Sequence, residues 1–185
     1  SSVGCTISGT VQPPGVGSAD PTGKREETQV DTSAGIAAAV ALAQQALEDD
    51  VGGPFGAIVV QGGRVVGRGR NRVLADHDPT AHAEVLAIRD ACRTLGTHDL
   101  RGSVVYASSE PCPMCLGALY WARVDRVMFG APREEAARVG FDDAFLYEEL
   151  SRLRADRRLV VEHVPTPAAT EVLTRWAARP DRTPY

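Results

Sequence analysis

The residues best suited to chemistry in this sequence are two cysteines and a histidine, which are common metal ligands. Cys112 and Cys115 are three positions apart, so their sulfurs face the same side of a helical turn. Pro113 favours the first position of a helix, where unpaired N–H groups and the helix dipole stabilise thiolates. His82 supplies a third, neutral ligand. Together these residues predict one Zn²⁺ per chain.

The pattern offers no obvious fourth protein ligand, and this feature separates a catalytic zinc from a structural one. The last tetrahedral position would hold a water or hydroxide, because zinc lowers the pKa of bound water to about 7. Glu84, two residues after His82, points away from the metal ligand on a helix and can act as a base without binding zinc. We therefore predict a zinc-dependent hydrolysis in which Glu84 moves the protons.

A lone Cys-x-x-Cys also fits other interpretations, namely a redox pair or half of a structural zinc knuckle. The upstream His82-x-Glu84 argues against a redox pair, and a knuckle needs a second pair of ligands. A zinc-stabilised interaction module without activity is a further alternative, although a structural zinc has no use for a neighbouring base. The other cysteines and histidines lie at no paired metal-ligand spacing: Cys5, His77, Cys92, His98 and His163.

His82-x-Glu84 with Pro111-Cys112-x-x-Cys115 matches the signature of the zinc-dependent nucleobase deaminases. Over roughly residues 34–185 the sequence also resembles the bacterial guanine deaminases. The stretches that carry this resemblance are Gly53–Ala57, Asn71, Asp78–Glu84, Cys112–Trp121, Gly140–Asp143 and Tyr185. The resemblance implies hydrolytic deamination of guanine to xanthine and ammonia, in purine catabolism or salvage.

The resemblance also implies which residues bind the purine base. Asn71, Trp121, Asp143 and Tyr185 would surround the substrate, and Phe55 would contact its ring. Asn71 offers a donor and an acceptor, Asp143 can accept from ring N–H groups, and Trp121 offers a flat apolar wall. Taken singly, these residues also fit a turn asparagine, a surface acid and a core aromatic residue.

A swapped dimer is the assembly that the resemblance implies. In the guanine deaminases the C-terminal segment crosses to the partner subunit, so we expect a homodimer in which Tyr185 reaches the partner's site. Glu171 is a candidate second proton carrier there, whereas a frayed terminus is the ordinary fate of a last residue. Guanosine deaminases and enzymes acting on other amino-purines or aminotriazines remain alternatives. The tRNA adenosine deaminases fit less well, because they would be expected to have a basic surface.

Composition and charge narrow the class of protein further. The 185 residues fit one domain with a substantial core, since 43% of them are hydrophobic, and no apolar run is long enough to cross a membrane. Acidic residues outnumber basic ones by 24 to 20, which argues against nucleic acid as a partner and for a small substrate. Few cysteines, thiolate ligands and no recognisable secretory signal predict a cytoplasmic location.

The elements that must position these residues begin after residue 33. Residues 1–33, rich in Ser, Gly, Pro and Thr, predict a flexible extension, and residues 34–185 the deaminase domain. In the first half, the pattern predicts a helix from Gly35, strands at 56–60 and 65–70 joined by Gly62-Gly63, and a helix capped by Thr80 and ending near Leu95. A strand at 104–108, a helix at 113–122 and a strand at 126–130 follow. The remaining elements are helices at 133–139 and 145–153, a strand at 159–164 and a helix at 170–178.

This order of strands and helices indicates an α/β fold. Both ligand segments are expected at the carboxyl ends of strands and at helix N-termini, where α/β sheets bind ligands. We predict a three-layer α/β/α sandwich around a central mixed sheet of about five strands, the cytidine-deaminase-like architecture that the resemblance also implies.

Overall fold

The computed structural model describes residues 30–183. Most of the predicted extension and Tyr185 therefore lie outside the described residues. In chain order the elements are α1 (Thr32–Glu48), β1 (Gly56–Gln61), β2 (Arg64–Arg70), α2 (Val73–Asp76), α3 (Ala83–Leu95), β3 (Ser103–Ser109), α4 (Pro113–Ala122), β4 (Arg126–Ala131), α5 (Arg133–Arg138), α6 (Ala144–Ser151), η1 (Arg154–Asp156) and α7 (Pro167–Ala177).

The described strands form one mixed sheet in the order β2-β1-β3-β4. β1 pairs antiparallel with β2 and β3, while β3 and β4 are parallel. The β1–β2 hairpin turns at Gly62 and Gly63, whose φ angles of 54° and 70° suit the turn that joins twisted strands. β3 and β4 end side by side, and the segments that follow them can reach the same edge of the sheet.

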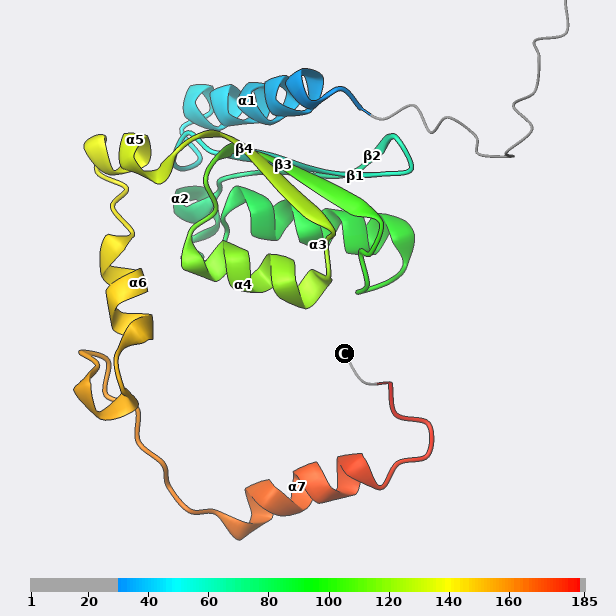
Figure 1. The fold of residues 1–185 in the computed structure, drawn as a ribbon, viewed down its shortest axis with the longest axis vertical. Helices are drawn as coiled ribbons and strands as arrows, with labels where there is room; N and C mark the ends of the chain where they lie inside the picture. The colour runs from blue at the N-terminus through cyan, green and yellow to red at the C-terminus, as the bar shows by residue number, and fades with distance from the viewer. Residues whose placement is uncertain (1–29, 184–185) are drawn as a thin grey trace, which may run out of the picture.

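Helices cover both faces of the sheet, as the predicted three-layer sandwich requires. Figure 1 shows α1 on one side of the strands and α3 and α4 on the other. Alternate residues of β1 divide between the layers: Ala57 and Val59 face the α3 and α4 side, whereas Ile58 and Val60 face α1. The two-residue period of the strands thus builds two cores.

Small residues bring α3 unusually close to β2. The inward stripe of α3 consists of Ala83, Ala87 and Ala91, all fully buried and spaced by four. Opposite them, a Cβ atom on Gly69 would lie 2.0 Å from the carbonyl oxygen of Ala83, and one on Gly67 would lie 2.3 Å from that of Ala87. The backbone of β2 therefore fixes the position of α3, including its first turn.

Two predictions about elements were wrong. The helix predicted to be capped by Thr80 has His82 at its N-cap position instead. The hydroxyl and N–H of Thr80 donate to Asp78 Oδ1 at 2.7 and 2.8 Å, so Thr80 belongs to the preceding turn. The strand predicted at 159–164 is irregular, and the described sheet has four strands instead of about five. This segment leaves the body of the protein, so it has no neighbouring strand to pair with.

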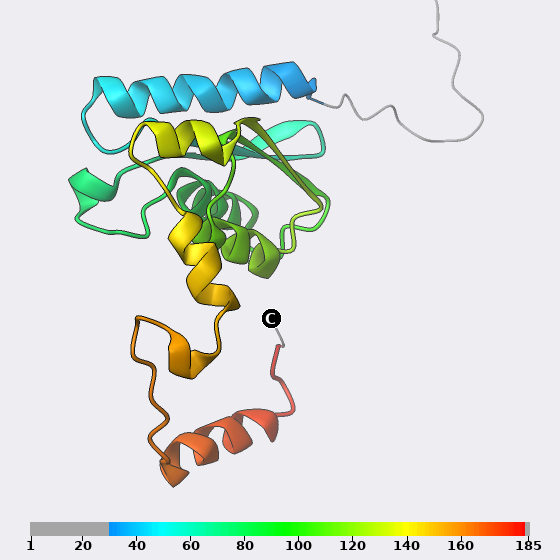
Figure 2. The ribbon, with the colours of Figure 1, turned by 60° about the vertical axis from the view of Figure 1, so that its left-hand side comes forward.

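The chain after α5 forms an extended arm. Figures 1 and 2 show α6 leading away from the sheet and α7 lying apart from the other helices. No described helix combines the length and the hydropathy needed to span a membrane. The arm keeps many apolar side chains exposed, among them Leu153, Leu159, Val164, Leu173 and Trp176.

Candidate metal centre and active site

The predicted metal ligands meet where α3 and α4 begin. His82 and Cys112 are the N-cap residues of these helices, and Cys115 lies in the first turn of α4. His82 Nδ1 lies 3.6 Å from Cys112 Sγ and 3.5 Å from Cys115 Sγ. A nitrogen and a sulfur on one tetrahedral zinc are about 3.5 Å apart, given Zn–N and Zn–S bonds of about 2.0 and 2.3 Å. The ligand atoms therefore already have the spacing of a zinc site.

The electrostatics of the two cysteines also suit a cation. The Cys115 thiol hydrogen-bonds Cys112 and, helped by His82, lowers the pKa of Cys112 to about 4. The same hydrogen bond, burial and the Glu84 carboxylate raise the pKa of Cys115. The pKa of His82 is raised, chiefly by its hydrogen bond with Cys112. The pair thus holds a thiolate at neutral pH, and a divalent cation can displace the remaining thiol proton.

Glu84 lies beside the ligands without adding an atom to their cluster. Among the described residues, the group with metal-binding spacing is His82, Cys112 and Cys115. The Cys115 thiol donates to Glu84 Oε2 at 3.4 Å, and the Glu84 residue is only 7% exposed. Burial raises the pKa of the Glu84 carboxyl. A carboxyl with a raised pKa holds a proton more readily, which suits a group that takes up a proton and returns it.

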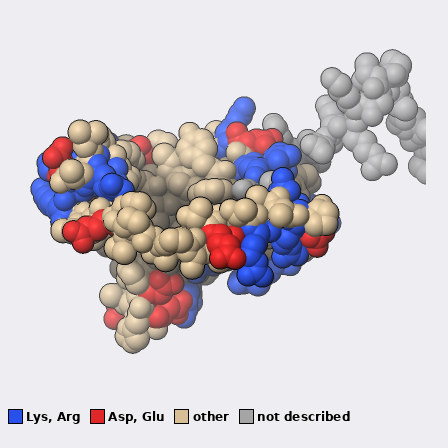
Figure 3. Space-filling model, turned by 90° about the horizontal axis from the view of Figure 1, so that it is seen from below, with Lys and Arg blue, Asp and Glu red and all other residues tan. Residues whose placement is uncertain are grey.

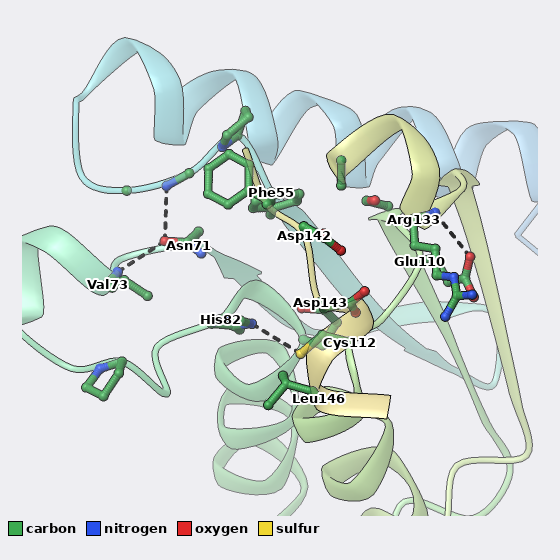
Figure 4. Close-up of a pocket in the computed structure, with 18 of the residues that line it drawn as sticks. Phe55, Asn71, Val73, His82, Glu110, Cys112, Arg133, Asp142, Asp143 and Leu146 are labelled. Atoms are coloured by element: carbon green, nitrogen blue, oxygen red, sulfur yellow. Dashed lines mark hydrogen bonds between the residues drawn. The ribbon is translucent and has the colours of Figure 1, made fainter. Parts of the chain in front are cut away.

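A cavity of about 540 Å³ opens above this centre, a size typical of small-molecule sites. Glu84, His82 and Cys112 line its base, and Asn71 and Phe55 line one wall. Figure 4 shows Asn71 turned toward the chain before and after it. Asn71 Oδ1 accepts from the N–H groups of Gly53 and Val73 at 3.2 and 3.1 Å. Because the amide oxygen is occupied, its NH₂ group is the part left to donate to a ligand.

The opposite wall carries the predicted Asp143. It occupies the N-cap position of α6, yet among the described residues its carboxylate makes no capping bond, since Asp142 Oδ1 accepts from Ala144 N at 2.9 Å. Burial and the Cys112 thiolate raise the pKa of Asp143. Phe141 lies in the same wall, with its ring edge-on to that of Phe55 and the two ring centroids 4.8 Å apart. The structure therefore brings Asn71 and Asp143 to one cavity, on either side of the metal centre (Figure 4).

Trp121 is not part of this cavity in the single chain. It follows Cys112 by more than two turns of α4, is 68% exposed, and lines no wall of the cavity. Tyr185 lies outside the described residues, and Glu171 lies on α7 in the arm. Of the predicted substrate-binding residues, Asn71 and Asp143 therefore line the cavity of a single chain, whereas Trp121 does not and Tyr185 is not described.

Three residues near the cavity were not predicted from the sequence. Glu110 and Arg133 line it, and Tyr147 lies under the Arg133 guanidinium, 4.8 Å from it to the ring centroid. Glu110 could have been predicted from its position, because it immediately precedes the Pro-Cys pair of the metal-ligand segment. Arg133 and Tyr147 carried no such signal, because an arginine at a helix start and a tyrosine in an amphipathic helix are ordinary surface residues.

A metal centre of one nitrogen and two sulfur ligands, with a buried carboxylate beside it at helix starts of an α/β/α sandwich, defines a zinc-dependent hydrolase. The particular family follows from comparison with known proteins. Residues 30–131 match the cytidine and deoxycytidylate deaminase zinc-binding region. The chain belongs to this zinc-binding family, and His82, Cys112 and Cys115 form the group that could hold the metal ion.

Curated and solved relatives narrow the comparison. The chain is 48% identical over 121 residues to guanine deaminase of Bacillus subtilis, covering 65% of this chain and 78% of the relative. A solved structure of guanine deaminase from the same organism superposes with a TM-score of 0.81 and 39% identity, covering 84% of this chain and 99% of that one. A tRNA-specific adenosine deaminase of Aquifex aeolicus is 37% identical over 123 residues, covering 66% of this chain and 79% of the relative.

Proposed function

We propose that this protein is a guanine deaminase, which hydrolyses guanine to xanthine and ammonia. One observation carries the proposal: the buried Glu84 adjoins a zinc-type ligand set at the base of a cavity whose walls present Asn71 and Asp143. The solved guanine deaminase supports it, because the superposition covers 84% of the chain and so extends well beyond the zinc-binding region at 30–131.

The chain's own residues account for the proton transfers. Bound zinc would activate a water molecule for attack on the ring carbon that carries the amino group. Glu84 takes up the two protons of this water in turn and delivers one to the ring nitrogen and the other to the leaving amine. The reaction consumes one water, breaks the C–N bond and leaves a carbonyl group on the ring. Because Glu84 is buried, the proton it takes up is not lost to bulk water.

Recognition of the base follows from the two walls. The Asn71 NH₂ group can donate to an acceptor on the purine, and the Asp143 carboxylate can accept from its N–H groups. The Phe55 ring offers an apolar surface beside them. We also assign Trp121 and Tyr185 to substrate binding, as part of the same proposal, through a second copy of the chain.

A tRNA adenosine deaminase is the alternative raised by the relatives. Such an enzyme is expected to hold its RNA on a basic surface. On the face shown in Figure 3, basic side chains form two separate groups, with acidic side chains near them and mainly uncharged residues between. This distribution, with more acidic than basic residues overall, favours a small uncharged substrate.

The arm supports a homodimer in which the C-terminal segments are exchanged. α7 is amphipathic, and its apolar residues Val172, Leu173 and Trp176 are 63%, 69% and 41% exposed. The body exposes apolar residues of its own on α4, notably Tyr120 and Trp121 at 78% and 68%. Exposed apolar surfaces of this kind mark interaction sites, and exchange of an identical element is a low-cost route to a dimer.

The experiment that tests the function is ammonia release by zinc-loaded protein. The substrates are guanine, guanosine, adenine, cytosine and an adenosine-containing RNA stem-loop, each tested with the wild type and with Glu84→Gln. Glu48→Gln, at the exposed end of α1, is the matched control. We expect turnover of guanine, loss of about 10²- to 10⁴-fold in Glu84→Gln, and wild-type turnover in the control.

Other outcomes would redirect the assignment. Preferred turnover of guanosine would keep the mechanism and change the substrate, and preferred turnover of the RNA would establish the alternative enzyme. No ammonia from any substrate, with one zinc bound per chain, would contradict the proposal and favour a zinc-stabilised interaction module.

A further inference from the structure

The segment that carries Asp143 is weakly attached to the rest of the protein. In α5 and α6, both within the described chain, no side chain is buried. Phe141 contacts Phe55, but this contact lies two residues before Asp143 and does not involve α6. A carboxylate that must face a substrate needs its helix held on the other side as well.

The backbone of Arg133 is held at the end of the sheet by hydrogen bonds. Its backbone N–H donates to Glu110 Oε2 at 3.2 Å. The Glu110 N–H donates in turn to the carbonyl oxygen of Ala131 at 2.9 Å, and the Ser109 hydroxyl donates to the same oxygen at 3.2 Å. These bonds tie the first residue of α5 to the ends of β3 and β4, close to the zinc ligand Cys112.

The side chain of Arg133 reaches from this point to α6. Its guanidinium lies over the Tyr147 ring, 4.8 Å from the centroid, within the range of a cation–π interaction. Tyr147 follows Asp143 by four residues, so both side chains lie on the same face of the helix. Burial, together with the Asp143 and Glu110 carboxylates, raises the pKa of the Tyr147 phenol, which agrees with this placement.

We propose that Arg133 is a positioning residue: it clamps Tyr147 and thereby holds Asp143 at the cavity wall opposite Asn71. The clamp links the zinc-ligand loop, through Glu110, to the helix that presents the base-binding carboxylate. The inference rests on the proposed function for its kinetic consequence, since it assumes that Asp143 binds the substrate. Figure 4 shows Arg133 and Glu110 beside Asp143 on this side of the cavity.

Loss of the clamp should affect substrate binding more than chemistry. Asp143 would be displaced while Glu84 and the metal ligands, held by α3 and α4, stay in place. A displacement of about 1 Å in a binding group can lower kcat/KM by about 10²-fold. For Arg133→Ala we expect kcat/KM to fall about 10- to 100-fold, mainly through KM, with zinc content unchanged.

A double-mutant cycle tests the clamp in the full-length, zinc-loaded enzyme. Arg133→Ala, Tyr147→Ala and the double variant are compared with Arg138→Ala, a control on the same helix whose ion pair with Glu135 lies outside the cavity. We expect the double variant to be no worse than either single one, and the control to behave like the wild type. Tyr147→Phe, which keeps the ring, and Arg133→Lys, which keeps the charge, should recover most of the loss in KM.

Additive losses in the double variant, or an Arg133→Ala variant that behaves like Arg138→Ala, would overturn the inference. Hydrogen exchange of residues 141–151 provides a readout that needs no activity. Arg133→Ala should reduce the protection of these residues and Arg138→Ala should not. If wild-type enzyme fails to deaminate guanine, the proposed function fails, whereas unchanged exchange in Arg133→Ala would refute the clamp itself.

Discussion

Asn71 shows how one buried side chain can serve both the fold and the ligand. It is 4% exposed, and its oxygen holds the N–H groups of Gly53 and Val73. A Cβ atom on Gly52 would lie 2.1 Å from this oxygen, so the loop is closely fitted around the asparagine. The oxygen of Asn71 is therefore structural, and we propose that its NH₂ group binds the substrate.

This division can be tested with two substitutions of Asn71. Asn71→Asp keeps an acceptor for both N–H groups and loses the donor, so kcat/KM for guanine should fall at least about 10-fold while thermal stability changes little. Asn71→Ala leaves the two N–H groups unpaired and should lower the free energy of unfolding by about 1–3 kcal/mol. Steady-state kinetics and denaturant unfolding distinguish the two effects. Wild-type kinetics in Asn71→Asp would show that the NH₂ group does not contact the base.

The Asp78 carboxylate, in the turn before His82, should make the stability of the protein depend on pH. The hydroxyl and N–H of Thr80 donate to this carboxylate and lower its pKa. Because the pKa is lower in the folded state, the carboxylate stabilises the protein above its ordinary pKa, and this contribution is lost as the pH falls through the folded-state pKa. As the pH is lowered, the melting temperature should therefore fall less steeply in Asp78→Asn than in the wild type. Equal slopes would mean that the turn does not contribute to acid sensitivity.

At the scale of elements, the contact between β2 and α3 positions the chemistry. The glycines of β2 let the backbone of α3 lie directly against the strand. The first turn of this helix carries His82 and Glu84. A side chain at this contact would push against backbone atoms, which cannot rotate away. The precision of the metal centre therefore depends on residues that have no chemistry of their own.

Gly69→Ala should displace α3 and loosen the metal centre. Overpacking of this kind typically costs about 1–3 kcal/mol in the free energy of unfolding, and zinc affinity should fall with it. Gly117→Ala is the matched control, because a Cβ atom there meets nothing within 4 Å. In a helix interior it should instead stabilise by about 0.5–1 kcal/mol. Unfolding and zinc-binding titrations check both, and a Gly69→Ala variant with normal zinc affinity would contradict this role of the contact.

Local signals explain which elements were predictable. α4 matches its predicted bounds, because Pro113 marks its start and a continuous apolar stretch follows. The Gly62-Gly63 turn was confirmed, since few residues other than glycine adopt both φ angles readily. The short helix α2 was missed, because four residues carry too little periodicity to be recognised. The strand at 159–164 was predicted from composition, but a strand needs a neighbour that no local pattern reveals.

At the scale of the whole molecule, the predicted site is incomplete in one chain. The metal ligands, Glu84, Asn71 and Asp143 come together around the cavity, because short connections link them to neighbouring elements of one sandwich. Trp121 and the residues of α7 do not line the cavity, and α7 lies apart from the other helices (Figure 2). Sequence patterns report the environment of a residue within its own chain. They could not show whether Trp121 completes a site in another copy.

Complementation between two impaired variants tests the exchange of arms. Glu84→Gln keeps an intact arm, and Tyr185→Ala keeps an intact metal centre. After the two proteins are mixed and allowed to exchange subunits, about a quarter of the sites should combine both intact parts, and activity should rise toward that fraction of the wild type. Light scattering measures the oligomeric state in parallel. Activity equal to the sum of the separate variants would contradict a shared site.

The two halves of the metal centre are far apart along the chain. His82 and Cys112 are separated by 30 positions and begin different helices. An ion that binds both acts as a cross-link, closing the intervening segment into a loop and restricting the unfolded chain, as a disulfide of that span would, by about 3–4 kcal/mol. A chelator would therefore cut the cross-link and disable catalysis in one step. Resistance to proteases and enzymatic turnover should then decline with the same time course.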